Sequence, residues 1–279
     1  MLHEINTCIW FEKDAKGAAD FYKSVFPDFE LISENPLAVN YRIGGRRFMN
    51  LNGGPGFPVN PSIPFFYTTD SASAIEKIWD QLTVGGKILM PLNNYPWNEK
   101  YGWCADQFGI NWQLMLVKDV ASQVVPNMMF VQNNNGKAGE AIEFYTSIFP
   151  DSEIQAISRY EKGEPDVEGN IKYSRFNLNA LPFSAMESSM QHDFNFNEGV
   201  SFILTLDTQD EIDYYWDLFS KGGSPGKCGW IKDKYGVNWQ VVPSILGKLM
   251  SDPKTAPKAV YAFLQMSKFI IDDLEKAVK

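Results

Sequence analysis

The chain has few of the side chains that most often bind transition metals or form disulfides. Its 279 residues include only two histidines, His3 and His192, and three cysteines. A pair of metal sites built on imidazole ligands would need more histidines than this. The cysteines are odd in number and none recurs at a matching place in the repeat described below, which excludes a disulfide framework. A reducing compartment suits such a chain.

Positive charge is also scarce. The 25 Lys and Arg residues stand against 34 Asp and Glu, and the formal net charge is −9. The basic residues are scattered along the chain, so a phosphate backbone would be repelled. The start of the chain has no basic segment before an apolar run, and no apolar run is long enough to span a bilayer. We therefore expect a cytoplasmic protein with no nucleic-acid partner and no membrane partner.

What is present is an internal repeat. Residues 21–28 (FYKSVFPD) recur as residues 144–151 (FYTSIFPD), and residues 102–113 recur in the same order as residues 229–240. The length and the 44% hydrophobic content are typical of two globular domains. Because each copy serves as a control for the other, a ligand-like residue present in only one copy becomes visible.

Each copy is predicted to contain two modules of one strand, one helix and three strands (βαβββ). Residues 5–11 are β-prone, and residues 14–26 carry apolar side chains at helical spacing, with Asp14 as the N-cap. The same order returns later in the first copy and twice in the second. The predicted fold class is α+β, with domains at residues 1–122 and 123–243 and a helical tail at residues 244–279.

One asymmetry separates the copies. Trp103 follows Gly86 by 17 positions (103 − 86), whereas Trp230 follows Gly223 by 7 (230 − 223). The extra segment of the first copy, around residues 91–97, is either a long hairpin or a functional loop, and the hairpin is favoured because functional loops are the rarer class.

Two features carry a resemblance to a known family. The first is the segment at residues 106–113 (DQFGINWQ), repeated at residues 233–240 (DKYGVNWQ), and the second is the end of the chain around residues 263–271 (FLQMSKFII). Together with the tandem βαβββ modules, they resemble the PhnB-like branch of the glyoxalase and bleomycin-resistance fold, the vicinal oxygen chelate superfamily. The resemblance implies that the two copies pair as an internal pseudo-dimer.

This branch often carries the label 3-demethylubiquinone-9 3-methyltransferase, which the residues do not support as an activity. A methyltransferase needs a strand, a Gly-rich loop and a helix to hold its nucleotide-like cofactor. The only Gly-rich stretch, residues 52–56 (NGGPG), contains Pro55 and leads into another strand.

Metal-dependent members of the superfamily take one ligand, usually His or Glu, from each of four strands. The second of these positions is Asn50 in the first copy and Ala185 in the second. A shift of two residues along the strand would bring Asn52 and Glu187 there instead. Neutral groups cannot offset the charge of a desolvated divalent ion, so the sequence predicts no metal and no cofactor. The resemblance places the four positions at Asn6, Asn50, Ser201 and Gln240 in one cavity and at Pro126, Ala185, Pro64 and Gln113 in the other.

The candidate pocket residues follow from this comparison. Gln113 and Gln240 each follow a tryptophan that is expected to pack in the core, so their side chains point to the other face of the strand. They either have no role in binding, or orient a small polar ligand with their amides. No catalytic residue is identified, because the cysteines lack an evident base, and turn capping explains the matched Asp106 and Asp233. The ligand-pocket candidates are Asn6, Asn50, Ser201, Gln240, Gln113 and Glu187.

Three hypotheses remain. The leading one is a metal-independent small-molecule-binding protein of the glyoxalase-like fold, monomeric or homodimeric. The alternative is a divergent metal-dependent lyase or dioxygenase-like enzyme with one site near Glu187 and His192. The third is a scaffold whose tail at residues 253–279 recruits a partner, although packing of that tail on the domain is favoured.

Overall fold

The computed structural model describes residues 3–279, which fall into two compact units. The large unit is Thr7–Val200, and the C-terminal unit combines Ser201–Lys279 with the segment that ends at Asn6. These units are not the two sequence repeats, because strands of both repeats pair within the large unit. The domain boundaries drawn from the repeat therefore stay a prediction.

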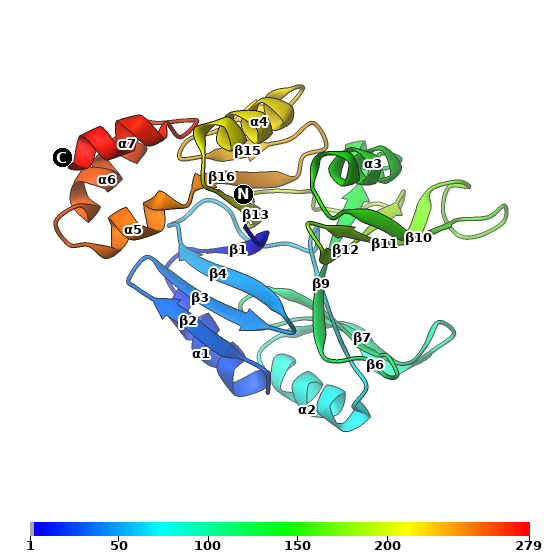
Figure 1. Cartoon of the computed structure of the whole chain (residues 1–279). Coiled ribbons are helices and arrows are strands. Elements are labelled where there is room, and N and C mark those ends of the chain that lie inside the picture. The colour runs from blue at the N-terminus through cyan, green and yellow to red at the C-terminus, as the bar shows by residue number, and fades with distance from the viewer. Residues whose placement is uncertain (1–2) are drawn as a thin grey trace. The chain divides into compact units, whose positions relative to one another are not determined.

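The predicted order of one strand, one helix and three strands occurs four times along the chain (Figure 1). The extra segment of the first copy is a hairpin, formed by two strands that are both longer than their counterparts in the second copy. The first two modules comprise β1 (Asn6–Phe11), α1 (Ala15–Val25), β2 (Glu30–Glu34), β3 (Ala38–Ile43), β4 (Arg46–Asn52), β5 (Phe65–Thr69), α2 (Ala72–Leu82), β6 (Lys87–Tyr95), β7 (Asn98–Ala105) and β8 (Asn111–Leu116).

The second copy repeats this order, with a short 3-10 turn before its first helix. Its first strand begins at Gln123, the first residue of the predicted second domain. The last two modules comprise β9 (Gln123–Val131), η1 (Gln132–Asn134), α3 (Ala138–Ile148), β10 (Glu153–Arg159), β11 (Ile171–Leu178), β12 (Leu181–Ser188), β13 (Val200–Leu206), α4 (Gln209–Ser220), β14 (Ser224–Pro225), β15 (Trp230–Lys232) and β16 (Asn238–Pro243).

An eight-stranded sheet lies wholly within the large unit, in the order β10-β11-β12-β9-β5-β8-β7-β6. Its centre is the antiparallel pair of β9 and β5, which joins one strand from each repeat. Helices α2 and α3 pack against one face of this sheet. We call the opposite face the open face. In the same unit, β1 pairs with β4 in parallel, and β4, β3 and β2 continue as an antiparallel meander.

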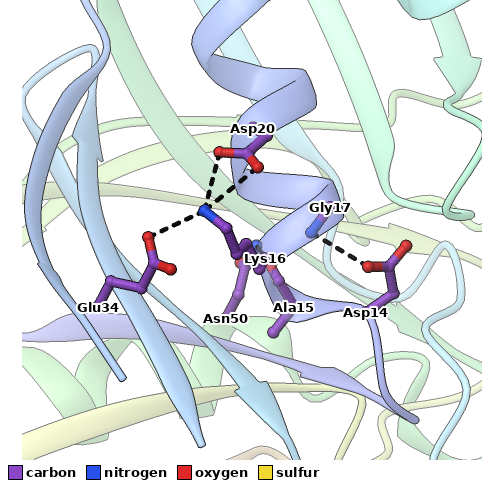
Figure 2. A network of polar contacts seen from close by, with 7 residues as sticks. All are labelled: Asp14, Ala15, Lys16, Gly17, Asp20, Glu34 and Asn50. Carbon is purple, nitrogen blue, oxygen red and sulfur yellow. Dashed lines mark hydrogen bonds and ion pairs between the residues drawn. The ribbon is translucent and has the colours of Figure 1, made fainter. Parts of the chain in front are cut away.

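The helix α1 begins where the sequence predicted. The carboxylate of Asp14 accepts a hydrogen bond from the backbone N–H of Gly17 at 3.1 Å, which satisfies one of the free donors of the first turn (Figure 2). The buried side of the helix carries small residues and Tyr22. An exposed ion pair between Lys16 and Glu34 joins the helix to β2. Such an exposed pair adds little stability, so packing holds the helix in place.

The recurring segment at residues 106–113 forms a buried turn. Asp106 accepts hydrogen bonds from the backbone N–H groups of Phe108 and Ile110, from Trp112 Nε1 at 3.0 Å and from the hydroxyl of Tyr22 at 2.8 Å. Burial raises the pKa of this carboxyl to about 6, although the four donors act in the opposite direction. Turn capping, as predicted, explains the conserved spacing between the two copies without catalysis.

The C-terminal unit repeats this turn. Asp233 accepts from the backbone N–H groups of Tyr235 and Val237 and from Trp239 Nε1 at 2.9 Å. Strands β14, β15, β16 and β13 lie in that order, and α4 packs against β14 to β16. The tail is helical, as predicted, and comprises α5 (Ile245–Ser251), α6 (Ala256–Phe263) and α7 (Ile271–Val278).

The three tail helices pack around their own small core. Leu249, Ala259, Phe269 and Leu274 are buried in it. The side chain of Gln209, at the start of α4, donates to the carbonyl of Phe269 and accepts from the N–H of Ile271. These two bonds attach the tail to the rest of the C-terminal unit.

Candidate functional site

The open face of the eight-stranded sheet presents the groups most suited to binding a ligand. Successive side chains of a strand point to opposite faces. On β8, Trp112 is therefore directed to the helix-covered face, and Gln113 and Met115 are directed to the open face. The cross-strand partners of these two are Trp103 and Tyr101 on β7, which share their face.

Gln113 is the central polar group of the open face. It is 3% exposed, and its Oε1 accepts a hydrogen bond from the hydroxyl of Tyr101 at 3.1 Å. Its Nε2 donates to no acceptor in the part of the chain that the structure describes. A buried amide with unused N–H donors is suited to bind an oxygen of a ligand.

Apolar and aromatic side chains surround this pair. Phe66, Tyr101 and Val125 form the buried centre of the cluster. Partly buried methionines and aromatics pack against them, namely Met90, Tyr95, Trp103, Met115, Tyr173 and Met186. Methionine side chains adapt to irregular ligands, and aromatic walls with a few polar groups are typical of small-molecule sites.

A cavity of about 50 Å³ opens at the end of the cluster near β11. Phe66 and Thr68 of β5, Met115 of β8 and Tyr173 and Arg175 of β11 line it. Arg175 is its only cationic lining residue, and its guanidinium donates to the side-chain oxygen of Gln123 at 3.2 Å. Burial raises the pKa of Tyr173, although the nearby Arg175 acts against that shift, so the phenol stays neutral.

Asn127 is a polar residue of this face that the sequence did not single out. It is fully buried, and its Nδ2 lies 3.2 Å from the sulfur of Met129 and 3.3 Å from that of Met186. Its Oδ1 has no hydrogen-bond partner among residues 3–279. An unsatisfied buried carbonyl costs free energy unless something else donates to it. The alternation of β9 could have identified this residue, since it is next to the proposed position at Pro126.

The sequence resemblance assigned Pro126, Ala185, Pro64 and Gln113 to one ligand cavity. In the structure these residues do not share one face of the sheet. Gln113 reaches the open face. Pro126 pairs with Phe65 and Ala185 is two residues from Glu187, so both are directed to the helix-covered face. Pro64 precedes β5, and its carbonyl accepts from the N–H of Asn127 at 2.9 Å.

Asn50, a candidate for the other cavity, is fully buried beneath α1. Its Oδ1 accepts from the hydroxyl of Tyr41 at 2.8 Å, and its Nδ2 donates to the carbonyl of Ala15 at 3.1 Å. Figure 2 shows Asn50 next to Ala15 at the start of the helix. Asn52, two residues further along β4, accepts from the N–H of Ala15 at 2.9 Å. Both amides therefore position the start of α1.

In the C-terminal unit, the structure brings two candidates together. Gln240 Nε2 donates to the hydroxyl oxygen of Ser201 at 3.0 Å, and both residues are buried. Asn6 belongs to the same unit, and its buried Oδ1 has no hydrogen-bond partner in the part of this unit that the structure describes.

Both carboxylate oxygens of Glu187 accept hydrogen bonds from backbone N–H groups. It is 3% exposed, its Oε1 accepts from the N–H of Ala138 at 2.8 Å, and its Oε2 accepts from the N–H of Ile171 at 2.5 Å. The first bond places a carboxylate at the N-terminus of α3, where the helix dipole favours negative charge. His192 bonds through Nε2 to the hydroxyl of Ser188 at 2.9 Å instead.

The polar side chains of the open face are mostly uncharged. Its polar groups are amides, hydroxyls and thioethers with one guanidinium at the edge, which are poor ligands for a hard divalent ion. Within residues 3–279, no group of three or more His, Cys, Asp or Glu side chains could hold a metal ion. Burial also raises the pKa of the Cys104 thiol to about 12, which disfavours the reactive thiolate.

Comparison with known proteins identifies the family. The chain matches the family described as 3-demethylubiquinone-9 3-methyltransferase twice, over residues 3–115 and 122–242, and it belongs to this family. The two matches confirm the tandem arrangement and the PhnB-like resemblance. The description is the name of the family and shows no activity for this chain. A search of curated proteins found no match.

Solved structures agree on the fold. Glyoxalase I from Zea mays is 13% identical, with a TM-score of 0.57, over 90% of this chain and 97% of that protein. A PhnB protein from Bacillus cereus, titled a putative 3-demethylubiquinone-9 3-methyltransferase, is 29% identical over 41% of this chain and 100% of its own length, with a TM-score of 0.39. The chain is thus an α+β protein with two glyoxalase-like domains in tandem. Over the described residues, none of the helices combines the length and apolar character needed to cross a membrane.

Proposed function

We propose that this protein binds a small molecule on the open face of its eight-stranded sheet, and that it does so without a resident metal ion. The observation that carries the proposal is the buried pair of Gln113 and Tyr101, whose unused N–H donors lie among aromatic and methionine side chains. Such a surface recognises shape and hydrogen bonds rather than polarising a substrate.

The donor set of this face supports the metal-independent part of the proposal. Gln113 stands at the position where the resemblance expects a carboxylate ligand, and the neighbouring Asn127 is neutral as well. A divalent ion there would lose its hydration shell without gaining a compensating charge. No second function is proposed at Glu187, because both of its oxygens already accept backbone N–H groups.

Metal analysis tests the first half of the proposal. The purified protein is incubated with Zn²⁺, Ni²⁺, Mn²⁺ or Fe²⁺, dialysed and analysed for metal by mass spectrometry, and substoichiometric metal is expected in every case. Tight binding at one ion per chain would contradict the proposal.

Native mass spectrometry tests the second half. A small molecule carried through purification should be lost on denaturation, and the double variant Gln113→Ala with Asn127→Ala should carry less of it than the wild type. A control variant at an exposed position of α3, Glu143→Gln, should carry the wild-type amount. The cytoplasmic location and the monomeric or dimeric state stay predictions from the sequence.

A further inference from the structure

A long groove runs between α1 and α2 of the large unit, two helices that lie next to each other (Figure 1). Its volume is about 630 Å³, and the last turn of α1, the segment after it and one side of α2 line it. The ten residues from Ser71 to Gln81 (81 − 71) rise about 15 Å along α2. This length matches about four or five residues of an extended peptide.

The groove has an apolar floor and a polar rim. Phe26 and Ile78 line it and are each only 2% exposed, so they belong to the packed interior. Lys23, Ser73 and Lys77 also line it, and they are exposed. Because the floor leaves little apolar surface to cover, the polar groups of the rim decide what the groove can bind.

The rim is positively charged, although the chain as a whole carries a formal net charge of −9. Lys23 and Lys77 are the only charged residues of the lining. Neither ammonium group makes an ion pair in the part of the chain that the structure describes, and Asp20 of α1 and Glu76 of α2 each pair with another lysine. Two cations in one groove without a carboxylate attract an anionic partner.

The second copy of the repeat has no such pair of cations. Lys23 is the third residue of the segment 21–28, and the third residue of the matching segment 144–151 is Thr146. Lys77 and Tyr214 each stand six residues after the N-cap of their helix, α2 and α4 (77 − 71 and 214 − 208). The helices therefore form without a cation at these positions, so helix formation does not account for the two lysines.

We propose that the groove between α1 and α2 binds an acidic peptide segment of a partner protein, with carboxylates of the peptide on Lys23 and Lys77. An ammonium group has three donors and accepts a carboxylate from several directions, which suits the side chains of Asp and Glu. The amide of Gln81 is a further polar group at the far end of the groove. No residue of the open face lines the groove, so this binding is independent of the proposed function.

Two matched peptides test the charge of the ligand. Hexaglutamate and hexaglutamine carrying the same dye are titrated with the full chain at low ionic strength, and fluorescence anisotropy reports binding. Hexaglutamate should bind about tenfold more tightly, since two exposed ion pairs contribute roughly threefold each. Raising the salt concentration should remove this difference.

Two double variants separate the groove from net charge. Lys23→Gln with Lys77→Gln should reduce the affinity for hexaglutamate about tenfold, to that for hexaglutamine. Lys13→Gln with Lys162→Gln removes the same charge at exposed positions outside the groove and should leave the affinity unchanged. Thermal unfolding of both variants should match that of the wild type, because all four side chains are exposed.

Several outcomes would overturn the proposal. These are no binding of hexaglutamate at millimolar concentration, or an equal loss of affinity in both double variants. Succinate that displaced hexaglutamate at an equal concentration would show a site for small anions instead. A dimer seen by sedimentation that dissociated only in the variant at Lys23 and Lys77 would show that a second copy fills the groove. In each case the co-purification experiment on the open face would still decide the proposed function.

Discussion

Tyr101 and Gln113 form a buried hydrogen bond between neighbouring strands, with the tyrosine hydroxyl 3.1 Å from the amide oxygen. In this arrangement the amide oxygen of Gln113 faces the tyrosine hydroxyl. Since Oε1 is occupied by Tyr101, the Nε2 group is the end that remains available on the open face. The two residues therefore act as one unit, in which a phenol sets the donor direction of an amide.

Replacing Tyr101 by Phe should release this amide. We expect the free energy of unfolding to fall by about 1 kcal/mol, because Gln113 Oε1 loses the hydrogen bond from Tyr101 while the ring packing stays. Urea unfolding followed by circular dichroism measures the change. The control is Tyr95→Phe, whose hydroxyl bonds to the carbonyl of Pro91 at an exposed site and should cost less. Equal effects of the two variants would contradict a larger stabilising contribution of the buried Tyr101 hydrogen bond.

Asp106 should make the stability depend on pH between about 4 and 6. Its folded pKa of about 6 lies above the unfolded value of 3.8, so the folded state holds the proton to higher pH. This difference in pKa adds about 3 kcal/mol to the free energy of unfolding below pH 4. The added stability is lost as the pH rises through 6. The wild type should thus lose this stability relative to Asp106→Asn over that window.

Carboxyl NMR gives a direct measurement of the same group. The resonance of Asp106 should titrate with a midpoint near 6. A midpoint near 4 for Asp106 would show that its four donors outweigh its burial.

Glu187→Gln should destabilise the protein by about 2 kcal/mol. A glutamine can accept only one of the two backbone N–H groups and places its own NH₂ against the other, at the start of α3. Chemical denaturation measures the loss, and the exposed Glu143 on the same helix offers the matched control Glu143→Gln. If Glu187 instead bound a catalytic metal, the substitution would abolish turnover with little change in stability.

The tail should behave as part of the C-terminal unit. Phe269 is 1% exposed and packs on Phe263, so Phe269→Ala should cost about 3–5 kcal/mol or release the tail from its unit. Limited proteolysis and thermal unfolding measure both effects. Tyr261, which is 75% exposed on α6, provides the control Tyr261→Ala. A tail that served only to recruit a partner would tolerate both changes equally.

Much of the fold was predictable because the repeat supplied each local pattern twice. The spacing of Asp14 and Tyr22 predicted a capped helix with one buried side, and both features are present. The pairing of Asp106 with Trp112 explains why the same eight-residue segment occurs in both copies. These interactions connect residues close in the chain, so the sequence shows them directly.

The site was harder to predict, because neighbouring residues of a strand face opposite sides. Counting positions along β9 led to Pro126, whereas the open face carries Asn127 one residue later. The same holds on β12, where Ala185 faces the helices and Ser184 pairs with Asn127. A shift of one residue changes the face of every side chain, and no local pattern reports such a shift in a strand buried on both sides.

By itself, the sequence determined the duplication, the four βαβββ modules, the helical tail and the lack of imidazole and thiolate ligands, because composition and local spacing carry that information. Only the tertiary structure decided that Gln113 meets Tyr101, that Glu187 caps α3 and that Arg175 stands beside an aromatic cavity. The reason is that each of these contacts depends on the register between strands or on the approach of a helix from another part of the chain. Those are set by the packing of the whole unit.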